Sequence, residues 1–145
     1  MRVVLQRVSY GRVSVEETIL AEIGLGMVIL LGIGPSDSEE QATYLVEKIA
    51  NLRIFEDDQA KMNRSLVDVG GSAIVVSQFT LYADTRKGRR PAFTDAAPPE
   101  QARKLVDVFV ELMKKQGVPT QTGEFGAHML VDIANNGPVT IWLER

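Results

Sequence analysis

Four consecutive residues after an apolar segment carry the groups best suited to chemistry in this chain. Ser77-Gln78-Phe79-Thr80 follows the apolar run Ala73–Val76, so hydroxyl and amide side chains stand where a buried strand would continue with apolar ones. Buried polar groups need hydrogen-bond partners. The run indicates either a strand end bonded to neighbouring turns or a site in which a hydroxyl and backbone donors face a ligand.

A second feature lies near the end of the chain, where Gly137-Pro138 occurs within Asn135–Thr140 and just before the strand-like Ile141–Leu143. Glycine allows either backbone hand, and proline fixes φ and lacks an N–H, so the two carbonyls are held in place. By itself the pair predicts a turn that begins a strand, and only about 5–6% of X–Pro bonds are cis. Held carbonyls could also recognise a ligand by shape.

Missing residue types exclude several kinds of catalytic centre. The chain has no cysteine, which excludes disulfides, thiolate nucleophiles and cysteine-based metal sites. Its single histidine, His128, cannot build a multi-histidine centre within one chain, and no neighbouring carboxylate indicates a catalytic triad. We expect no metal and no cofactor, and we expect His128 to be a surface or partly buried strand residue.

Charge gives a mixed indication about nucleic acid. The net charge of −3 argues against non-specific binding, which relies on Lys and Arg to neutralise phosphates. Locally, four cations crowd into one glycine-containing loop near Asp84: Arg86, Lys87, Arg89 and Arg90. This loop is either a phosphate contact or a solvated charged loop.

Length and composition indicate one globular domain, residues 1–145, with 45% hydrophobic and 24% charged residues. No run of about 18 apolar residues exists, and the N-terminal segment lacks the features of a signal peptide. We therefore expect a cytoplasmic protein without a membrane span.

Strands and helices must position these groups. Eight runs rich in apolar and β-branched residues predict strands: Arg2–Val8, Arg12–Val15, Ile19–Ile23, Leu25–Leu31, Ala73–Tyr82, Val118–Gly123, Leu130–Ile133 and Val139–Leu143. Turn residues at Tyr10-Gly11 and Gly24-Leu25-Gly26 favour consecutive hairpins. Asn51–Asp57 and Lys61–Leu66 fit loops or short strands equally well.

Two other segments predict helices. The first opens at Ser38, which Gln41 can complement in a capping box, and the second follows Pro98-Pro99 and stops at Gly117. Their apolar stripes are Ala42, Leu45, Val46, Ile49 and Leu52, then Ala102, Leu105, Val106, Phe109, Leu112 and Met113. We predict a β-rich, layered (β/β/α) α+β domain with two main helices packed on sheets.

Ser77–Asp84 and Asn135–Thr140 together resemble the two signature motifs of the bacterial and eukaryotic D-aminoacyl-tRNA deacylase family. The resemblance covers essentially the full length. It extends to Met1–Val8, Gly24–Gly26, Asn51–Phe55, Met62–Ser65, Lys87–Pro91 and Thr122–Ala127.

This resemblance implies a homodimeric carboxylic ester hydrolase that frees transfer RNA from D-amino acids, and from glycine misattached to alanine transfer RNA, as proofreading. It implies that Ser77–Thr80 lines the pocket of its own subunit and carries the catalytic groups. Phe125 and Met129, together with Gly137 and Pro138, would bind the aminoacyl-tRNA 3′ end and select its chirality. Gly137-Pro138 would be cis and would enter the partner's active site, so the site would lie at the subunit interface.

The implied chemistry asks little of side chains. An aminoacyl ester is activated, and the neighbouring ribose hydroxyl can help deliver water, which leaves positioning and oxyanion stabilisation to the protein. The main-chain N–H groups of Phe79 and Thr80 are the candidate donors because of their place in the motif. The Thr80 hydroxyl could instead be a nucleophile, although no adjacent base is evident.

Selection against L substrates would need a rigid wall, because D and L esters carry the same groups. The carbonyls of Gly137 and Pro138 could hold the substrate ammonium and fill the volume of an L side chain. Pocket shape alone contributes only about 1–3 kcal/mol per methylene. Glycine has no side chain to collide, so glycyl esters should also be cleaved.

Two other functional classes remain open. One is a non-catalytic nucleic-acid-binding module that uses the Arg86–Arg90 loop, and salt dependence without ester cleavage would identify it. The other is a general esterase with Thr80 as nucleophile, which would turn over simple aryl esters without transfer RNA.

Overall fold

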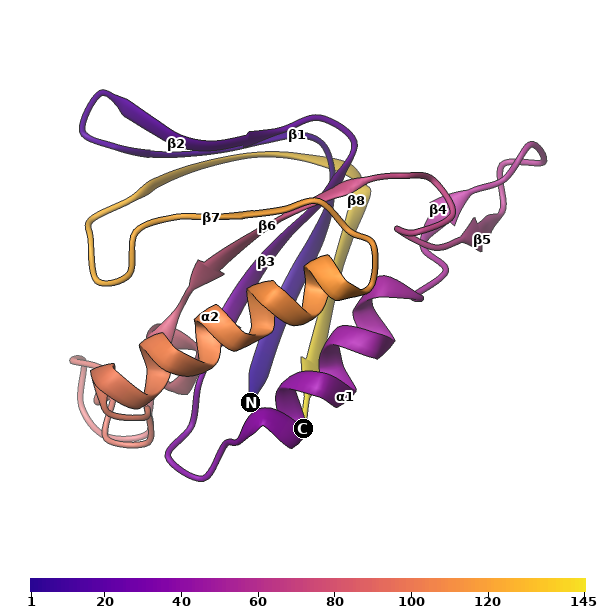
Figure 1. Ribbon diagram of the computed structural model, residues 1–145. Coiled ribbons are helices and arrows are strands. Elements are labelled where there is room, and N and C mark those ends of the chain that lie inside the picture. Colours follow the sequence, from indigo (N-terminus) through magenta and orange to yellow (C-terminus); the bar gives the residue numbers. More distant parts are fainter.

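Strand β1 (Arg2–Val15) is the axis of the fold because it pairs along both of its edges. The computed structural model describes residues 1–145 (Figure 1). Strands β3 (Gly26–Gly32) and β2 (Thr18–Ile23) follow one another along one edge, and β8 (Leu130–Glu144) runs along the other, all antiparallel to β1. Parallel strands β6 (Ser72–Ser77) and β7 (Thr120–Thr122) extend the sheet from β3 to six strands.

The sheet bends so that its two ends approach each other. The side-chain amide of Gln121 in β7 donates to the Glu22 carbonyl of β2 at 2.7 Å, and the Glu22 N–H donates back to Gln121 Oε1 at 2.9 Å. A second core lies inside the bend, with Val8, Val13 and Ile23 packed against Val28 and Ile74. The β-rich α+β prediction is confirmed, and its two β layers come from one bent sheet.

Both helices cover the other face of this sheet (Figure 1). Helix α1 (Glu39–Ala50) begins at the predicted capping box, in which Gln41 Oε1 accepts from the Ser38 N–H at 2.9 Å. Helix α2 (Pro99–Lys115) starts at a proline and is followed by Gly117 at φ +82°. The stripes are largely confirmed, since Ala42, Leu45, Val46, Ile49, Leu105, Val106, Phe109 and Met113 are buried.

The segment between α1 and β6 forms a separate two-stranded hairpin. Strand β4 (Phe55–Glu56) pairs with β5 (Met62–Arg64), so short strands rather than loops are present at the two ambiguous segments. No helix in the structure is long and apolar enough to cross a membrane.

The predicted turn at Tyr10-Gly11 is wrong, because β1 runs straight through both residues. Gly11 meets a packing requirement instead: a Cβ there would lie 2.8 Å from Val28 Cγ2. The β1–β2 hairpin turns at Glu16-Glu17, where Val15 pairs with Thr18. β2 and β3 form no second hairpin because β1 pairs with both of them.

Two other strand boundaries differ from the prediction. Strand β6 ends at Ser77, and a 3₁₀ turn, η1 (Phe79–Tyr82), replaces the expected continuation to Tyr82. The predicted strands Leu130–Ile133 and Val139–Leu143 belong to the single strand β8. Gly137-Pro138 is therefore not a turn that opens a strand.

Gly26 provides a test of the packing between β3 and β6. A Cβ at Gly26 would lie 1.8 Å from the Ser72 carbonyl oxygen, whereas one at Gly24 would have no neighbour within 4 Å. We expect Gly26→Ala to lower the free energy of unfolding by about 1–3 kcal/mol or more, and Gly24→Ala to change it by less than about 0.5 kcal/mol. Urea denaturation at one protein concentration measures both. Equal midpoints for the two variants would contradict this packing.

Candidate functional site

The turn η1 carries the first set of candidate groups. It is joined to the sheet by the Gln78 N–H, which donates to the Leu31 carbonyl of β3 at 2.8 Å. The first hydrogen bond of the turn runs from the Leu81 N–H to the Gln78 carbonyl at 3.2 Å. The N–H groups of Phe79 and Thr80 precede this bond and have no acceptor inside the turn. They remain available to a ligand.

The Thr80 hydroxyl is paired within the turn. Thr80 Oγ1 accepts a hydrogen bond from the side-chain amide of Gln78. An amide is no proton acceptor of the kind that activates a hydroxyl, so this contact supplies no general base. The geometry leaves Thr80 better suited to donate its backbone N–H than to attack.

A cavity of about 570 Å³ opens beside η1 and is mostly apolar. Its walls include the predicted Ser77, Gln78, Phe79, Phe125 and Met129. The Phe79 ring, 57% exposed as a residue, packs edge-to-face on Phe93 with centroids 4.9 Å apart. Five of the predicted residues therefore meet at one cavity, whose only polar side chains are those of Ser77 and Gln78; Thr80 does not line it.

A smaller, more polar hollow of about 420 Å³ adjoins this cavity across Phe125. Ser77, Val106 and Phe125 line both spaces. The Arg103 guanidinium lies 5.0 Å from the Phe125 ring centroid. This stacking holds the ring that separates the two spaces.

The Gly137-Pro138 segment loops out of β8. Val8 of β1 pairs with Asn135 and Gln6 pairs with Thr140, so four residues of β8 stand opposite the single residue Arg7. The Asn135 side chain closes the loop by accepting from the Val139 N–H at 3.0 Å. The Gly137–Pro138 peptide bond is cis.

Arg7 fixes the base of this loop. Its Nε donates to the Asn136 carbonyl at 2.9 Å and its Nη1 donates to the Ile54 carbonyl at 2.6 Å. The residue is 5% exposed. Gly137 has φ +132°, and a Cβ there would lie 3.0 Å from Arg7 Nη2. Glycine is thus required by both the backbone hand and the contact with Arg7.

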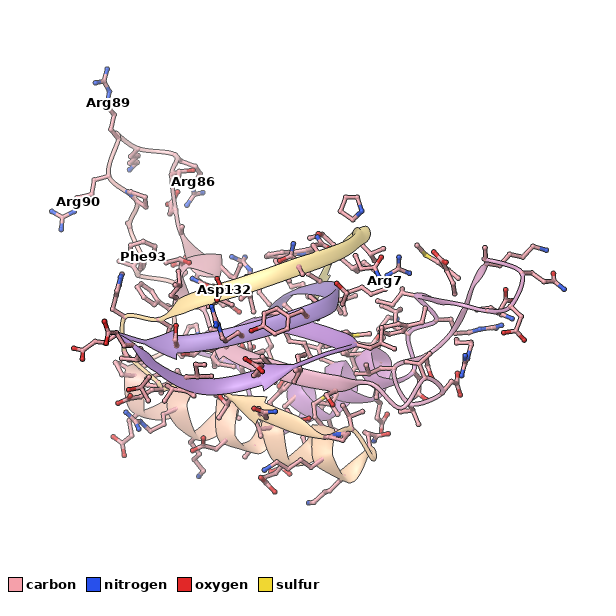
Figure 2. The ribbon with its side chains drawn as sticks, turned by 90° about the horizontal axis from the view of Figure 1, so that it is seen from above. Arg7, Arg86, Arg89, Arg90, Phe93 and Asp132 are labelled. Atoms are coloured by element: carbon pink, nitrogen blue, oxygen red, sulfur yellow. The ribbon has the colours of Figure 1, made fainter.

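One chain does not bring its two candidate sets together. Neither Gly137 nor Pro138 lines the cavity. Arg7, which holds their loop, and Phe93, which lines the cavity, lie toward opposite ends of the sheet (Figure 2).

The four predicted cations differ in their contacts. Arg86 is bound to Asp84 through Nε at 2.8 Å and Nη2 at 2.7 Å, and the Arg86 N–H donates to the same carboxylate. These bonds hold the pKa of Asp84 well below its usual range. Lys87, Arg89 and Arg90 form no ion pair, and Arg89 and Arg90 extend away from the body of the protein (Figure 2). Of the four predicted cations, Lys87, Arg89 and Arg90 therefore carry a charge without an ion-pair partner.

Several residues of the site escape sequence reasoning. Arg7 leaves a trace, because a charge interrupts an apolar strand pattern. Phe93 and the small residues Ala96 and Ala97 leave none, since a loop brings them to the cavity. His128 is exposed, as predicted, but it lies in the loop between β7 and β8 and not in a strand. No group of three or more His, Cys, Asp or Glu side chains is placed to hold a metal ion.

Comparison with known proteins gives a full-length match. A family model described as D-Tyr-tRNA(Tyr) deacylase matches residues 4–144. A D-aminoacyl-tRNA deacylase of Thermomicrobium roseum is 60% identical over 99% of this chain and 94% of that protein. One of Limosilactobacillus reuteri is 52% identical over the whole of both chains.

Solved structures share the fold. A c-Myc DNA unwinding element binding protein superposes with a TM-score of 0.93 at 40% identity, covering 100% of this chain and 99% of that one. A probable eukaryotic D-amino acid tRNA deacylase gives a TM-score of 0.84 at 18% identity, covering 98% and 97%. The second likeness concerns the fold alone.

The pairing of Asp84 with Arg86 predicts a pH response. A lowered pKa means that Asp84 stays ionised, and stays paired with Arg86, as pH falls through the range where an ordinary aspartate is protonated, about 3.9. In Arg86→Ala we expect Asp84 to titrate near that ordinary value. Carboxyl ¹³C chemical shifts measure both. Identical midpoints in the two proteins would show that Arg86 does not hold Asp84.

Proposed function

Because this chain belongs to the D-aminoacyl-tRNA deacylase family, we propose that it is a hydrolase that cleaves the ester between a D-amino acid and the 3′-terminal ribose of transfer RNA. The observation that carries the proposal is the cavity beside η1, in which five of the predicted site residues meet. Removal of D-amino acids from transfer RNA is a proofreading reaction, because it keeps them out of translation.

The cavity suits the terminal nucleoside of transfer RNA. Bases stack on aromatic side chains with about 1–3 kcal/mol each, and Phe79, Phe93 and Phe125 supply such surfaces. The polar side at Ser77 and Gln78 leads to the N–H groups of η1. A base seated between the aromatic rings would place the ribose and its ester toward these donors.

Hydrolysis then needs little beyond positioning. Water adds to the ester carbonyl carbon, and the negative charge that develops on the carbonyl oxygen is met by the N–H groups of Phe79 and Thr80. The carbon–oxygen bond to the ribose breaks, and the ribose oxygen takes the proton that water loses. The neighbouring 2′-hydroxyl of the substrate can relay that proton, so no side-chain base is required.

We assign the chiral wall to a second copy of the chain. The Gly137-Pro138 loop lies away from the cavity of its own chain, while Arg7 and Asn135 hold it rigidly outward. In a homodimer it would enter the partner's cavity, where its carbonyls accept from the substrate ammonium and occupy the space of an L side chain. The active site would then lie at the subunit interface.

A wall of this kind acts only on a side chain. Glycine has none, so glycyl esters, including glycine misattached to alanine transfer RNA, should enter and be cleaved. D-amino acids enter because their side chains leave Cα on the open side.

The remaining cations suit the phosphates of the acceptor end. Lys87, Arg89 and Arg90 are unpaired and project from one loop beside the cavity residue Phe93. The name of the solved relative with 40% identity refers to DNA binding. A net charge of −3 and a mostly apolar cavity beside the η1 N–H groups favour ester cleavage over a purely electrostatic binding role.

The test of this function compares three substrates. With D-, L- and glycyl-transfer RNA side by side, we expect the D-aminoacyl and glycyl esters to be cleaved and the L-aminoacyl ester to remain intact.

The wall is tested by Pro138→Ala, which frees φ at this position and should raise L-ester cleavage by about 10- to 200-fold. Pro119 is an exposed proline just before β7, and Pro119→Ala is the matched control, which should leave L esters intact. A D-aminoacyl ester that survives stoichiometric protein would refute the function, and complete L rejection by Pro138→Ala would refute the wall.

Thr80 separates substrate-assisted attack from covalent catalysis. Thr80→Ala keeps the backbone N–H and removes the hydroxyl that Gln78 binds. We expect kcat for D-aminoacyl-tRNA to fall by less than about 10²-fold, because loss of an oxyanion donor itself costs about 10²–10³. Thr80→Ser is the matched variant and should retain kcat. A loss of about 10⁴-fold in Thr80→Ala, with KM unchanged and Thr80→Ser active, would identify a nucleophile.

A further inference from the structure

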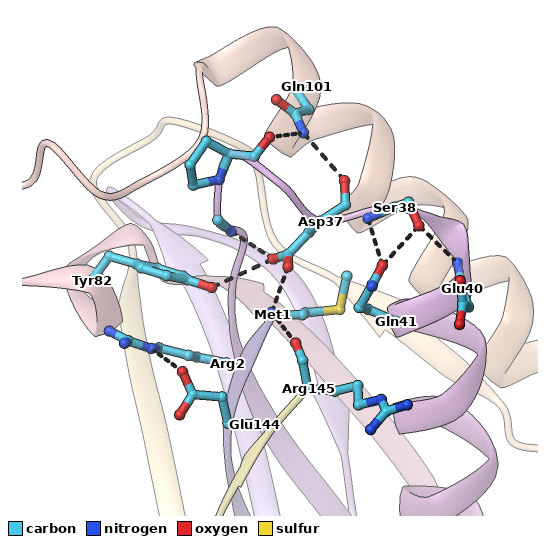
Figure 3. Close-up of polar contacts among 12 residues, drawn as sticks. Met1, Arg2, Asp37, Ser38, Glu40, Gln41, Tyr82, Gln101, Glu144 and Arg145 are labelled. Carbon is cyan, nitrogen blue, oxygen red and sulfur yellow. Dashed lines mark hydrogen bonds and ion pairs between the residues drawn. The ribbon is translucent and has the colours of Figure 1, made fainter.

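The turn that carries the candidate oxyanion donors is held from behind by a residue outside the cavity. Arg2, at the start of β1, donates from Nη1 to the Leu81 carbonyl at 3.0 Å. Its guanidinium carbon lies 4.3 Å from the ring centroid of Tyr82, and its Nε is paired with Glu144 of β8 at 2.8 Å (Figure 3). The Arg2 guanidinium thus contacts both Leu81 and Tyr82, the last two residues of η1.

The other side of Tyr82 meets Asp37. The Tyr82 hydroxyl donates to Asp37 Oδ2 at 3.4 Å, and the Gly34 N–H donates to the same oxygen at 2.6 Å (Figure 3). The α-amino group of Met1 binds Asp37 Oδ1 at 2.6 Å. Tyr82 is buried, and burial raises its pKa to about 12, so the phenol remains a neutral donor at ordinary pH.

Glycines at the end of β3 let Tyr82 sit directly on the backbone. A Cβ at Gly34 would lie 2.7 Å from the Tyr82 hydroxyl oxygen, and one at Gly32 would lie 3.1 Å from Leu81 Cβ. The second half of the turn, Leu81 and Tyr82, therefore packs against the protein, whereas Phe79 and Thr80 are exposed. Its position depends on these contacts because four residues of 3₁₀ helix hold few bonds of their own.

We propose that Arg2 is a positioning residue, which with Asp37 clamps Leu81 and Tyr82 and thereby fixes the Phe79 and Thr80 N–H groups at the distance that the oxyanion requires. Neither Arg2 nor Asp37 lines the cavity, so both act through η1. The inference rests on the proposed function, in which those two N–H groups contact the reacting carbonyl. A displacement of about 1 Å in such a group costs about 10²-fold in rate.

The test uses two arginines of the same strand. Arg2 and Arg12 each form a cross-strand ion pair with β8, at 2.8 Å to Glu144 and 2.8 Å to Asp132, but only Arg2 contacts η1. In Arg2→Met we expect kcat for D-aminoacyl-tRNA to fall by about 10- to 100-fold with KM changed by less than about threefold. Arg12→Met should keep both constants. The Phe79 and Thr80 amide cross-peaks should shift in the first variant and stay in place in the second.

Arg2→Lys resolves the case in which Arg2→Met does not fold. Lysine keeps the charge beside Glu144 but lacks the planar fork that stacks and donates together, so kcat should again fall while KM holds. Wild-type kcat and unshifted Phe79 and Thr80 amides in Arg2→Lys, or equal losses in the Arg2 and Arg12 variants, would overturn the proposal. Absence of D-aminoacyl-tRNA cleavage by the wild-type protein would instead refute the proposed function, and the amide shifts would still report whether Arg2 positions η1.

Discussion

Strand β1 pairs with β2 and β3 along one edge and with β8 along the other, and this pairing determines where both candidate parts of the site lie. Its register with β8 leaves four residues opposite Arg7, which forces the Gly137-Pro138 segment out of the sheet. Its pairing with β3 sets the strand end to which the Gln78 N–H binds, and so places η1. The same strand thereby puts the two candidate parts of the site toward opposite ends of one sheet. For this reason we propose that a second copy of the chain completes the site.

The proposed chemistry relies on backbone groups that are held in place rather than on reactive side chains. Two N–H groups of η1 would meet the oxyanion, and two carbonyls of the outward loop would meet the ammonium. An arginine of β1 binds each of the two segments that carry these groups. Arg2 donates to the Leu81 carbonyl of η1, and Arg7 donates to the Asn136 carbonyl of the loop. Preorganised dipoles cost no reorganisation during the reaction, which suits a chain that has no cysteine and one exposed histidine.

Local patterns of the sequence predict the local parts of this structure. The capping box at Ser38, the helix stripes and the β-rich composition carry over directly, because each depends on neighbours within a few residues. The errors concern long-range packing. Gly11 has the appearance of a turn residue but lies within β1, where Val28 leaves no room for a Cβ. Phe93 reaches the cavity through a loop whose path no periodicity records.

A mixed dimer tests whether the wall in each site comes from the other copy of the chain. One chain carries Pro138→Ala and an intact cavity, and the other carries Ala127→Trp, which fills the cavity but leaves the loop intact. With different affinity tags on the two chains, the heterodimer can be purified and assayed with D- and L-aminoacyl-tRNA. We expect the heterodimer to cleave the D ester and to reject the L ester, because its one open cavity receives an unaltered wall. If the heterodimer cleaves the L ester as fast per open cavity as the Pro138→Ala homodimer does, the wall acts within its own chain.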